Sequence, residues 1–219
     1  MRKPLSKDEL STISEVTLNH YELSAQSFWA GTKDHDVSQN YAALLGALPA
    51  RKGLRILDFG SGPGRDTLFF KTEGHLPTAL DGSASFCAMA RELTGRPVLH
   101  QNFLKLNLEP ASFDGVFANA SLFHVPSQEL PRVLGELKAA LVPGGILFSS
   151  NPRGSGEGWS GDRFGNYMEW DVYQAVLEKA GFEPLHHYYR PAGLPCSQQP
   201  WLAVVARAKS SRTERVHVP

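Results

Sequence analysis

The segment RILDFGSGPGRD, residues 55–66, constrains the fold more than any other stretch of the chain. Its apolar start is typical of a parallel strand that is covered on both faces. Gly60, Gly62 and Gly64 follow at once, and glycines at a turn can adopt backbone angles closed to other residues and let a ligand approach the main chain. The free N–H groups of a helix that starts here favour a bound carboxylate or phosphate. We therefore expect a ligand site where this strand gives way to a helix.

Strands and helices alternate from this point on, which is the pattern of a doubly wound α/β fold. The expected strands cover residues 54–59, 75–81, 97–100, 113–120, 145–151, 183–191 and 201–208, and the expected helices cover 64–73, 83–95, 127–141 and 168–182. Upstream, apolar spacing predicts a helix over 7–30 and a second one from Asp36 or Ser38 through Leu48. The glycine-rich stretch 153–166 is expected to be a lid or a flexible loop.

Composition limits the classes of protein to consider. Hydrophobic residues make up 42% of the 219 residues and charged residues 20%, as in ordinary soluble globular proteins. The 22 basic and 22 acidic residues balance, which counts against a nucleic-acid partner. No apolar run reaches the roughly 18 residues that cross a bilayer, and the N-terminus lacks the apolar core of a signal peptide, so we expect a cytoplasmic protein without a membrane partner. Two cysteines and scattered histidines predict neither a disulfide framework nor a metal site.

An acidic residue stands at the end of the second expected strand. Asp81, in ALDGS, lies 23 positions after Asp58 (81 − 58), which suits an acid that accepts hydrogen bonds from ribose hydroxyls. It could instead cap the helix that starts near Ser83. The glycine spacing GxGxG departs from the dinucleotide fingerprint GxGxxG. Arg65 and Asp66, next in the chain, suit a ligand that carries both a carboxylate and an ammonium group.

Four motifs in order, GSGPGRD, ALDGS, FDGVFANASLFHVP and LVPGGILF, resemble those of the class I S-adenosylmethionine-dependent methyltransferases, in particular the small bacterial methyltransferase-domain enzymes. The resemblance runs from about Tyr21 to Arg207. It implies a Rossmann-like α/β fold with a seven-stranded, mostly parallel sheet, an antiparallel last strand and helices on both faces. We expect residues 1–50 to form an N-terminal helical lid, 51–208 the S-adenosylmethionine-binding core, and 209–219 a disordered tail.

The resemblance also implies S-adenosyl-L-methionine as cofactor, S-adenosyl-L-homocysteine as product, and a set of contacts. The methionine part belongs at the first motif and beside it: Asp58, Gly60, Ser61, Gly62, Gly64, Arg65 and Asp66. The ribose and adenine belong at Asp81, Gly82 and Ser83. Asn102 stands where the family often has Asp, so its side-chain oxygen is expected to accept from the adenine amino group while Phe103 packs on the ring. The remaining expected contacts are Asn119, Ala120 and Ser121 at the end of the fourth strand, with Tyr21 and Phe28 from the lid. The spacing of Tyr21 and Phe28 fits core residues equally well.

The reaction implied is methyl transfer to a small-molecule acceptor by in-line displacement, in which positioning supplies much of the rate. His124 is expected to face the transferred methyl and to act as a base, since its unperturbed pKa of about 6.5 suits that work. Its alternative role is to hold the loop by a hydrogen bond. The acceptor wall is expected where positive charge and flat apolar faces combine, which suits an anionic or aromatic molecule: Arg153, Trp159, Arg163, Tyr167 and Trp170. Whether Arg190 reaches the site depends on how its strand faces.

Two other functions stay open at this point. One is an NAD(P)-dependent oxidoreductase, against which the GxGxG spacing and the lack of an apparent Tyr-x-x-x-Lys pair both count. The other is a non-catalytic S-adenosylmethionine-binding partner of a larger complex. The residues leave open the identity of the acceptor, the methylated atom (N, O, S or C), the need for a base, and whether the protein is a monomer or a homodimer.

Overall fold

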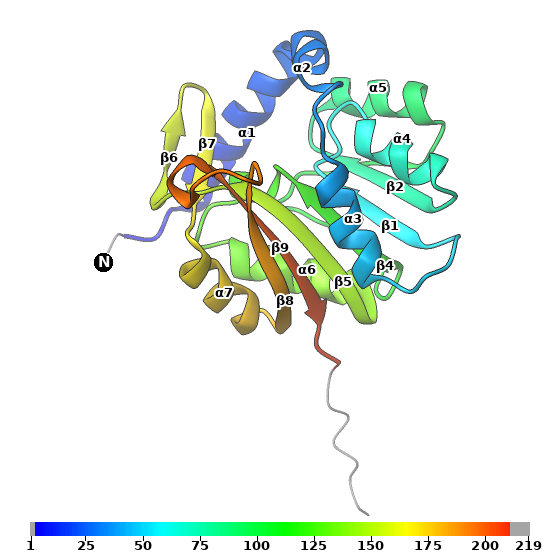
Figure 1. Cartoon of the computed structure of the whole chain (residues 1–219). Coiled ribbons are helices and arrows are strands. Elements are labelled where there is room, and N and C mark those ends of the chain that lie inside the picture. The colour runs from blue at the N-terminus through cyan, green and yellow to red at the C-terminus, as the bar shows by residue number, and fades with distance from the viewer. Residues whose placement is uncertain (1–2, 211–219) are drawn as a thin grey trace, which may run out of the picture.

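A seven-stranded sheet in the order β3-β2-β1-β4-β5-β9-β8 forms the centre of the computed structural model, which describes residues 3–210 (Figure 1). Its strands are β1 (Arg55–Phe59), β2 (Leu76–Asp81), β3 (Val98–His100), β4 (Phe113–Asn119), β5 (Leu141–Pro152), β8 (Phe182–Arg190) and β9 (Trp201–Ala208). The pairs from β3 to β5 are parallel, whereas β9 runs antiparallel to both β5 and β8. The predicted Rossmann-like fold with an antiparallel last strand is therefore confirmed.

Helices cover both faces of this sheet (Figure 1). One face carries α3 (Ser38–Ala47), α4 (Arg65–Thr72) and α5 (Ala84–Thr94), and the other carries α6 (Leu130–Ala140) and α7 (Trp170–Lys179). Successive residues of a strand point to opposite faces. Ile56 accordingly packs with Leu44 and Phe70 on the α3 side, while Leu57 packs with Leu137 and other residues on the α6 side. This explains why β1 is apolar at successive positions.

The N-terminal helix predicted over 7–30 is two helices, α1 (Lys7–Leu23) and α2 (Ala25–Thr32), so that prediction was wrong about continuity. They separate at Ser24, whose hydroxyl donates to the His20 carbonyl at 2.7 Å. A serine that bonds the backbone in this way competes with the helical ladder and favours a turn. α1 itself begins with a capping box made by Ser6 and Glu9.

The stretch 153–166, expected as a lid or flexible loop, is largely an antiparallel hairpin of β6 (Gly156–Ser160) and β7 (Arg163–Tyr167). Trp159 and Phe164 are paired across it, with ring centroids 5.6 Å apart in an edge-to-face contact. The Phe164 N–H donates to the Thr17 hydroxyl of α1 at 3.1 Å, which fixes the hairpin against the N-terminal helix. Glycine content suggested flexibility here, but the cross-strand aromatic pair and the contact with α1 order the segment.

Only part of the predicted tail can be compared with the structure. Residues 209 and 210 lie outside any strand or helix, and residues 211–219, the rest of the predicted disordered segment, lie outside the described residues. The division at residue 50 between a lid and a core remains a prediction. Within residues 3–210, no helix combines the length and the apolar character that crossing a membrane requires.

Candidate functional site

A cavity of about 820 Å³ lies at the strand ends beneath α1 and α2. The volume falls within the range typical of small-molecule pockets, about 300–1,000 Å³. Most of the residues predicted to contact the cofactor line it: Tyr21, Phe28, Gly60, Ser61, Gly62, Arg65, Asp66, Asp81, Gly82, Asn102, Phe103, Asn119, Ala120 and Ser121. Three of the predicted residues lie outside the lining: Asp58, Gly64 and Ser83. The fold thus gathers residues from five separate segments around one space.

The glycine turn serves two different purposes. Gly60 has a φ of +77°, and a Cβ there would overlap the Ser121 side chain and lie 3.2 Å from Phe103 Cζ. Gly64 has a φ of +99°, and a Cβ there would meet the Ala90 backbone of α5 at 3.0 Å. Gly60 therefore keeps the tips of β1 and β4 close beside the cavity, whereas Gly64 allows α4 and α5 to pack closely. Several amides of the turn are already used, because those of Gly60 and Ser61 donate to the Leu80 carbonyl.

Asp81 is buried, yet it borders the cavity. Its two carboxylate oxygens accept from the backbone N–H groups of Gly62 and Ser83, each at 2.9 Å. Burial raises the pKa of this carboxyl, and these backbone hydrogen bonds oppose the rise. A carboxylate oxygen can accept more than one hydrogen bond, so both oxygens keep capacity for a ligand. Asp81 consequently stabilises the start of α5, which is the helix-capping role that the sequence offered as an alternative. It does so without losing the capacity to accept hydrogen bonds from hydroxyl groups.

Asp58 lies beneath the glycine turn, outside the cavity lining. It is 1% exposed and accepts from the Thr67 hydroxyl of α4 at 2.5 Å. Burial raises the pKa of this carboxyl well above its usual range, and the nearby Asp66 adds to the effect. The contact ties the end of β1 to α4, so Asp58 positions the glycine turn and does not itself border the cavity.

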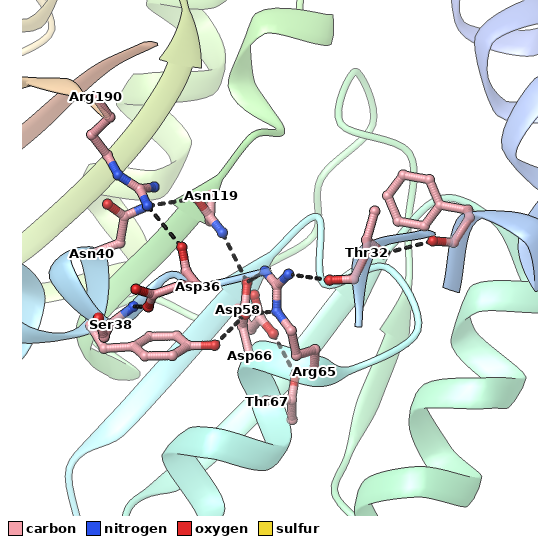
Figure 2. Close-up of polar contacts among 12 residues, drawn as sticks. Thr32, Asp36, Ser38, Asn40, Asp58, Arg65, Asp66, Thr67, Asn119 and Arg190 are labelled. Carbon is pink, nitrogen blue, oxygen red and sulfur yellow. Dashed lines mark hydrogen bonds and ion pairs between the residues drawn. The ribbon is translucent and has the colours of Figure 1, made fainter. Parts of the chain in front are cut away.

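Arg65 and Asp66 bind each other rather than facing the cavity as two free charges (Figure 2). The Arg65 guanidinium donates to both Asp66 oxygens, at 2.7 and 3.0 Å, and to the Thr32 carbonyl of α2 at 2.8 Å. Asp66 also accepts from the Tyr41 hydroxyl at 2.5 Å and from the Asn119 amide at 3.1 Å. This network joins α2, α3, α4 and β4 at the cavity wall and neutralises the two charges locally.

His124 and Tyr21 form a polar pair in the wall. His124 ends a short 3-10 helix, η1 (Leu122–His124), which follows β4. Its Nδ1 lies 2.7 Å from the Phe164 carbonyl, which can only accept, so Nδ1 carries the proton and Nε2 accepts from the Tyr21 hydroxyl at 2.8 Å. Burial lowers the pKa of His124 to about 4 and raises that of Tyr21. Both groups are therefore neutral at pH 7, and His124 holds the loop while also bordering the cavity.

Asn102 is engaged by neighbours on both sides. Its amide nitrogen donates to the Ser14 hydroxyl of α1 at 2.7 Å, and its oxygen accepts from the Leu104 N–H at 2.8 Å. Phe103 stacks on Phe59 of β1, with ring centroids 4.2 Å apart. The oxygen expected to meet adenine thus already has one partner and keeps one acceptor position.

Of the five residues predicted for the acceptor wall, only Arg163 lines the cavity. Arg153 is ion-paired with Glu169 at 2.9 Å, and Trp159 is 48% exposed on the hairpin. The other two also lie outside the lining: Tyr167 packs beside Gly154 and behind the lining residue Phe123, and Trp170 stacks on His187 with centroids 4.0 Å apart. The glycine-rich segment folds as a hairpin, so its aromatic and basic residues are not all directed to one space.

Several lining residues were not predicted as site residues, namely Trp29, Thr32, His35, Asp36, Ser150 and Trp201. Arg190, whose facing the sequence left open, also lines the cavity. Ser150, Arg190 and Trp201 meet through the pairing of β5, β9 and β8. The segment 29–36 is joined to the same wall by hydrogen bonds from Arg65 to the Thr32 carbonyl and from Arg190 to the Asp36 carbonyl. A polar residue at a strand end is a weak signal in the sequence, and it becomes informative only once the strand order is known.

Side-chain hydrogen bonds hold α1 over the cavity. Glu22 accepts from the Ser83 hydroxyl and from the hydroxyl and N–H of Ser85, at 2.6–3.0 Å, beside the N-terminus of α5. The hydrogen bonds from Ser83 and then from Ser85 lower the pKa of Glu22. In α1 only Ile13 and Thr17 are buried, so polar contacts contribute much of its attachment.

Known proteins share this architecture. A family model described as "Methyltransferase domain" matches residues 57–149, which run from β1 into β5. Malonyl-[acyl-carrier protein] O-methyltransferase of Pectobacterium atrosepticum is 36% identical over 105 residues, 48% of this chain and 41% of that protein. The 27-O-demethylrifamycin SV methyltransferase of Amycolatopsis mediterranei is 30% identical over 173 residues, 68% of this chain and 63% of that protein. The chain therefore spans only part of the length of each of these curated relatives.

A solved structure resembles nearly the whole chain. The 1,6-didemethyltoxoflavin-N1-methyltransferase of Burkholderia thailandensis, crystallised with 1,6-didemethyltoxoflavin and S-adenosylhomocysteine, superposes with a TM-score of 0.77. The match covers 96% of this chain and 94% of that one at 22% identity, so it establishes the fold alone. Residues 57–149 thus match the methyltransferase-domain family, and the strand order together with this superposition shows that the chain has the class I S-adenosylmethionine-dependent methyltransferase fold.

Proposed function

We propose that this chain binds S-adenosyl-L-methionine in the cavity and transfers its methyl group to a small-molecule acceptor by in-line displacement. One observation carries the proposal: the Gly60 turn, Asp81 and the Tyr21–His124 pair all border one cavity. When bound, the cofactor supplies an electrophilic methyl group on a sulfonium centre. The chain itself has to hold both partners, exclude water and receive any proton that the acceptor releases.

The residues present fit such a cofactor. Gly60 leaves the main chain accessible where a Cβ would overlap Ser121. Asp81 retains acceptor capacity for ribose hydroxyls, and its negative charge disfavours a 2′-phosphate. Three aromatic rings form a cluster in the wall, with Phe28 5.6 Å from Tyr21 and 5.1 Å from Phe86 between centroids. Aromatic faces favour a nearby cation by about 0.5–2 kcal/mol, which suits a sulfonium.

The Tyr21–His124 pair supports a role in proton handling. Tyr21 donates its hydroxyl proton to Nε2 of His124, whose other nitrogen is fixed on the Phe164 carbonyl. A proton taken up by the Tyr21 oxygen can therefore be matched by transfer of the hydroxyl proton to Nε2. With a pKa of about 4, His124 is a weak base. It suits a proton that becomes acidic as the acceptor gains the methyl group, rather than deprotonation of a free alcohol beforehand.

Calorimetry tests the binding half of the proposal. We expect the purified chain to bind S-adenosylhomocysteine and to show no heat with NAD or NADP. No heat with S-adenosylhomocysteine at millimolar concentration would overturn the proposal, and binding of NAD alone would favour the oxidoreductase. Transfer of labelled methyl groups to a panel of amines, alcohols, thiols and acids tests the catalytic half. Binding without transfer to any acceptor would favour a non-catalytic cofactor-binding protein.

Two variants test the polar pair. His124→Asn and Tyr21→Phe should each lower kcat by about tenfold or more, within the usual contribution of acid–base groups, while S-adenosylhomocysteine affinity changes by less than about twofold. His186→Asn, at an exposed histidine on β8, is the matched control and should leave both unchanged. If kcat of His124→Asn and of Tyr21→Phe equals that of the wild type and of the control, the pair has no part in proton transfer and only holds the loop.

A further inference from the structure

Two buried polar atoms in the cavity wall lack a hydrogen-bond partner within residues 3–210: the Ser150 hydroxyl oxygen and Arg190 Nε. Ser150 is only 1% exposed, so bulk water does not readily satisfy its hydroxyl. Buried polar groups are nearly always hydrogen-bonded, and leaving one unsatisfied costs stability. Two such atoms in one cavity wall therefore point to a ligand group that completes them.

Strand pairing places these two residues on the same face of the sheet. Ser150 of β5 lies opposite Ala203 of β9, and Arg190 of β8 lies opposite Trp201 of β9. Opposed residues share a face, as do residues two apart on one strand, so Ser150, Trp201 and Arg190 project to the same side. β5 and β8 are two strand spacings apart, roughly 10 Å. Ala203 itself is buried with Tyr188 opposite it, whereas Ser150, Trp201 and Arg190 all line the cavity, where a long arginine side chain and a small anion can span this distance.

The polar groups around them are already paired. Asn119, next to Ser150 in the sheet, donates to Asp66 and accepts from the Asn40 amide at 3.0 Å. Figure 2 shows Arg190 beside this asparagine pair, reaching toward Asp36. Asn119 and Asn40 therefore do not supply partners for the free donors on Ser150 and Arg190.

The charge of Arg190 favours an anion. Its terminal nitrogen donates to the Asp36 backbone carbonyl at 2.9 Å, and the exposed Asp36 carboxylate accepts from the Ser38 N–H. Within the described part of the chain, the guanidinium has no acidic side chain at ion-pair distance, whereas Arg65 is paired with Asp66. The Asp36 carboxylate is farther away: hydrogen bonds with Ser38 are the main causes that lower the pKa of Asp36, and the charge of Arg190 is the smallest of them. A planar guanidinium matches the two oxygens of a carboxylate, and a serine hydroxyl adds a further donor.

We propose that Ser150 and Arg190 form a carboxylate-binding subsite for the methyl acceptor, which makes the acceptor a carboxylic acid. This inference rests on the proposed function. The sheet order supports the assignment to the acceptor, because β8 is five strand positions from β2, about 24 Å, and β2 carries Asp81 for the ribose. A carboxylate is also present in the cofactor, so the test has to distinguish these two sources.

The first arm uses the full chain saturated with S-adenosylhomocysteine and simple acids as probes. Benzoate, phenylacetate and succinate are titrated beside benzamide, phenylacetamide and succinamide. At least one acid should bind with a Kd on the order of millimolar, and its amide at least about tenfold more weakly. Arg190→Gln and Ser150→Ala should each weaken acid binding by about fivefold or more. Arg207→Gln, an exposed arginine on β9 that lies outside the cavity lining, is the charge-matched control and should change nothing.

The second arm concerns the cofactor. The affinities of S-adenosylhomocysteine and of 5′-methylthioadenosine, which lacks the aminoacyl group, should stay within about twofold in both variants. If Arg190→Gln weakens S-adenosylhomocysteine but not methylthioadenosine, the subsite holds the cofactor's carboxylate and our assignment is wrong. Acids that fail to bind the wild-type complex, or that bind it and both variants alike, also overturn the inference. If the wild-type chain does not bind S-adenosylhomocysteine, the proposed function itself fails.

Thermal unfolding keeps the test independent of misfolding. Because the Ser150 hydroxyl is unsatisfied, Ser150→Ala should unfold at the wild-type temperature or above it in the absence of probe. The acid that stabilises the wild-type complex should then stabilise this variant less. A variant that unfolds earlier without probe would show that the hydroxyl has a structural partner, which contradicts the premise.

Discussion

Acid should destabilise this protein through His124. Burial holds the pKa of the folded histidine at about 4, whereas an unfolded chain has a value of about 6.5. The unfolded state therefore binds the proton first as pH falls, so the contribution of this group to stability is full above about pH 6.5 and is lost as pH falls toward 4. At pH 5 the loss is about 1.36 × log[(1 + 10^1.5)/(1 + 10^−1)], or about 2 kcal/mol.

Urea unfolding at pH 7.5 and pH 5.0 measures this loss. His124→Asn is the comparison, since its amide can still donate to the Phe164 carbonyl but does not titrate. Wild type should lose about 2 kcal/mol more than the variant between the two pH values. Asp58 and Asp81, whose pKa values are raised by burial, act in the opposite direction but equally in both proteins. Equal pH dependence in wild type and variant would refute a buried neutral imidazole, and His186→Asn controls for loss of an exposed histidine.

Two further predictions concern the glycine turn and the helices α1 and α2 that lie over the cavity. Gly60→Ala should lower the free energy of unfolding by about 2 kcal/mol or more and abolish S-adenosylhomocysteine binding, because of the positive φ and the overlap with Ser121. Gly46→Ala, in open space on α3, is the control and should leave stability unchanged or raise it. Urea unfolding measures the stability of both variants, and calorimetry measures their binding. Glu22→Gln, which removes the charge beside the α5 N-terminus, should speed proteolytic cleavage within α1 and α2 several-fold relative to Glu15→Gln on the same helix. Equal cleavage rates would show that the Glu22 contacts do not hold α1 over the cavity.

The sequence predicted the order of strands and helices in the core well, because apolar runs and glycine turns mark each strand end locally. It could not show the break at Ser24, since a serine inside a helical pattern is common and only its bond to His20 reveals the turn. The hairpin 156–167 was hidden for a related reason. Its stability depends on the cross-strand contact of Trp159 with Phe164 and on the hydrogen bond to Thr17, which is far away in the sequence.

The candidate site divides in the same way. Gly60 and Asp81 could be placed together because the carboxyl ends of neighbouring parallel strands meet at one edge of a sheet. The ion pair of Arg65 with Asp66 could not be foreseen, because residue type alone does not show whether a charge meets a ligand or a neighbour. Arg190 likewise needed the register of β8 against β9, where a slip of one residue would turn its side chain to the opposite face.

The position of β9 also affects how the chain can fold as it is synthesised. β9 separates β5 from β8, and within residues 3–210 it is the only strand that β8 pairs with. Residues 182–190 thus leave the ribosome before any strand is available to them, and their hydrogen-bonding edge stays open until residues 201–208 emerge. Assembly of this side of the sheet consequently has to wait for the synthesis of β9, and the wall that contains Arg190 and Trp201 can form only after it.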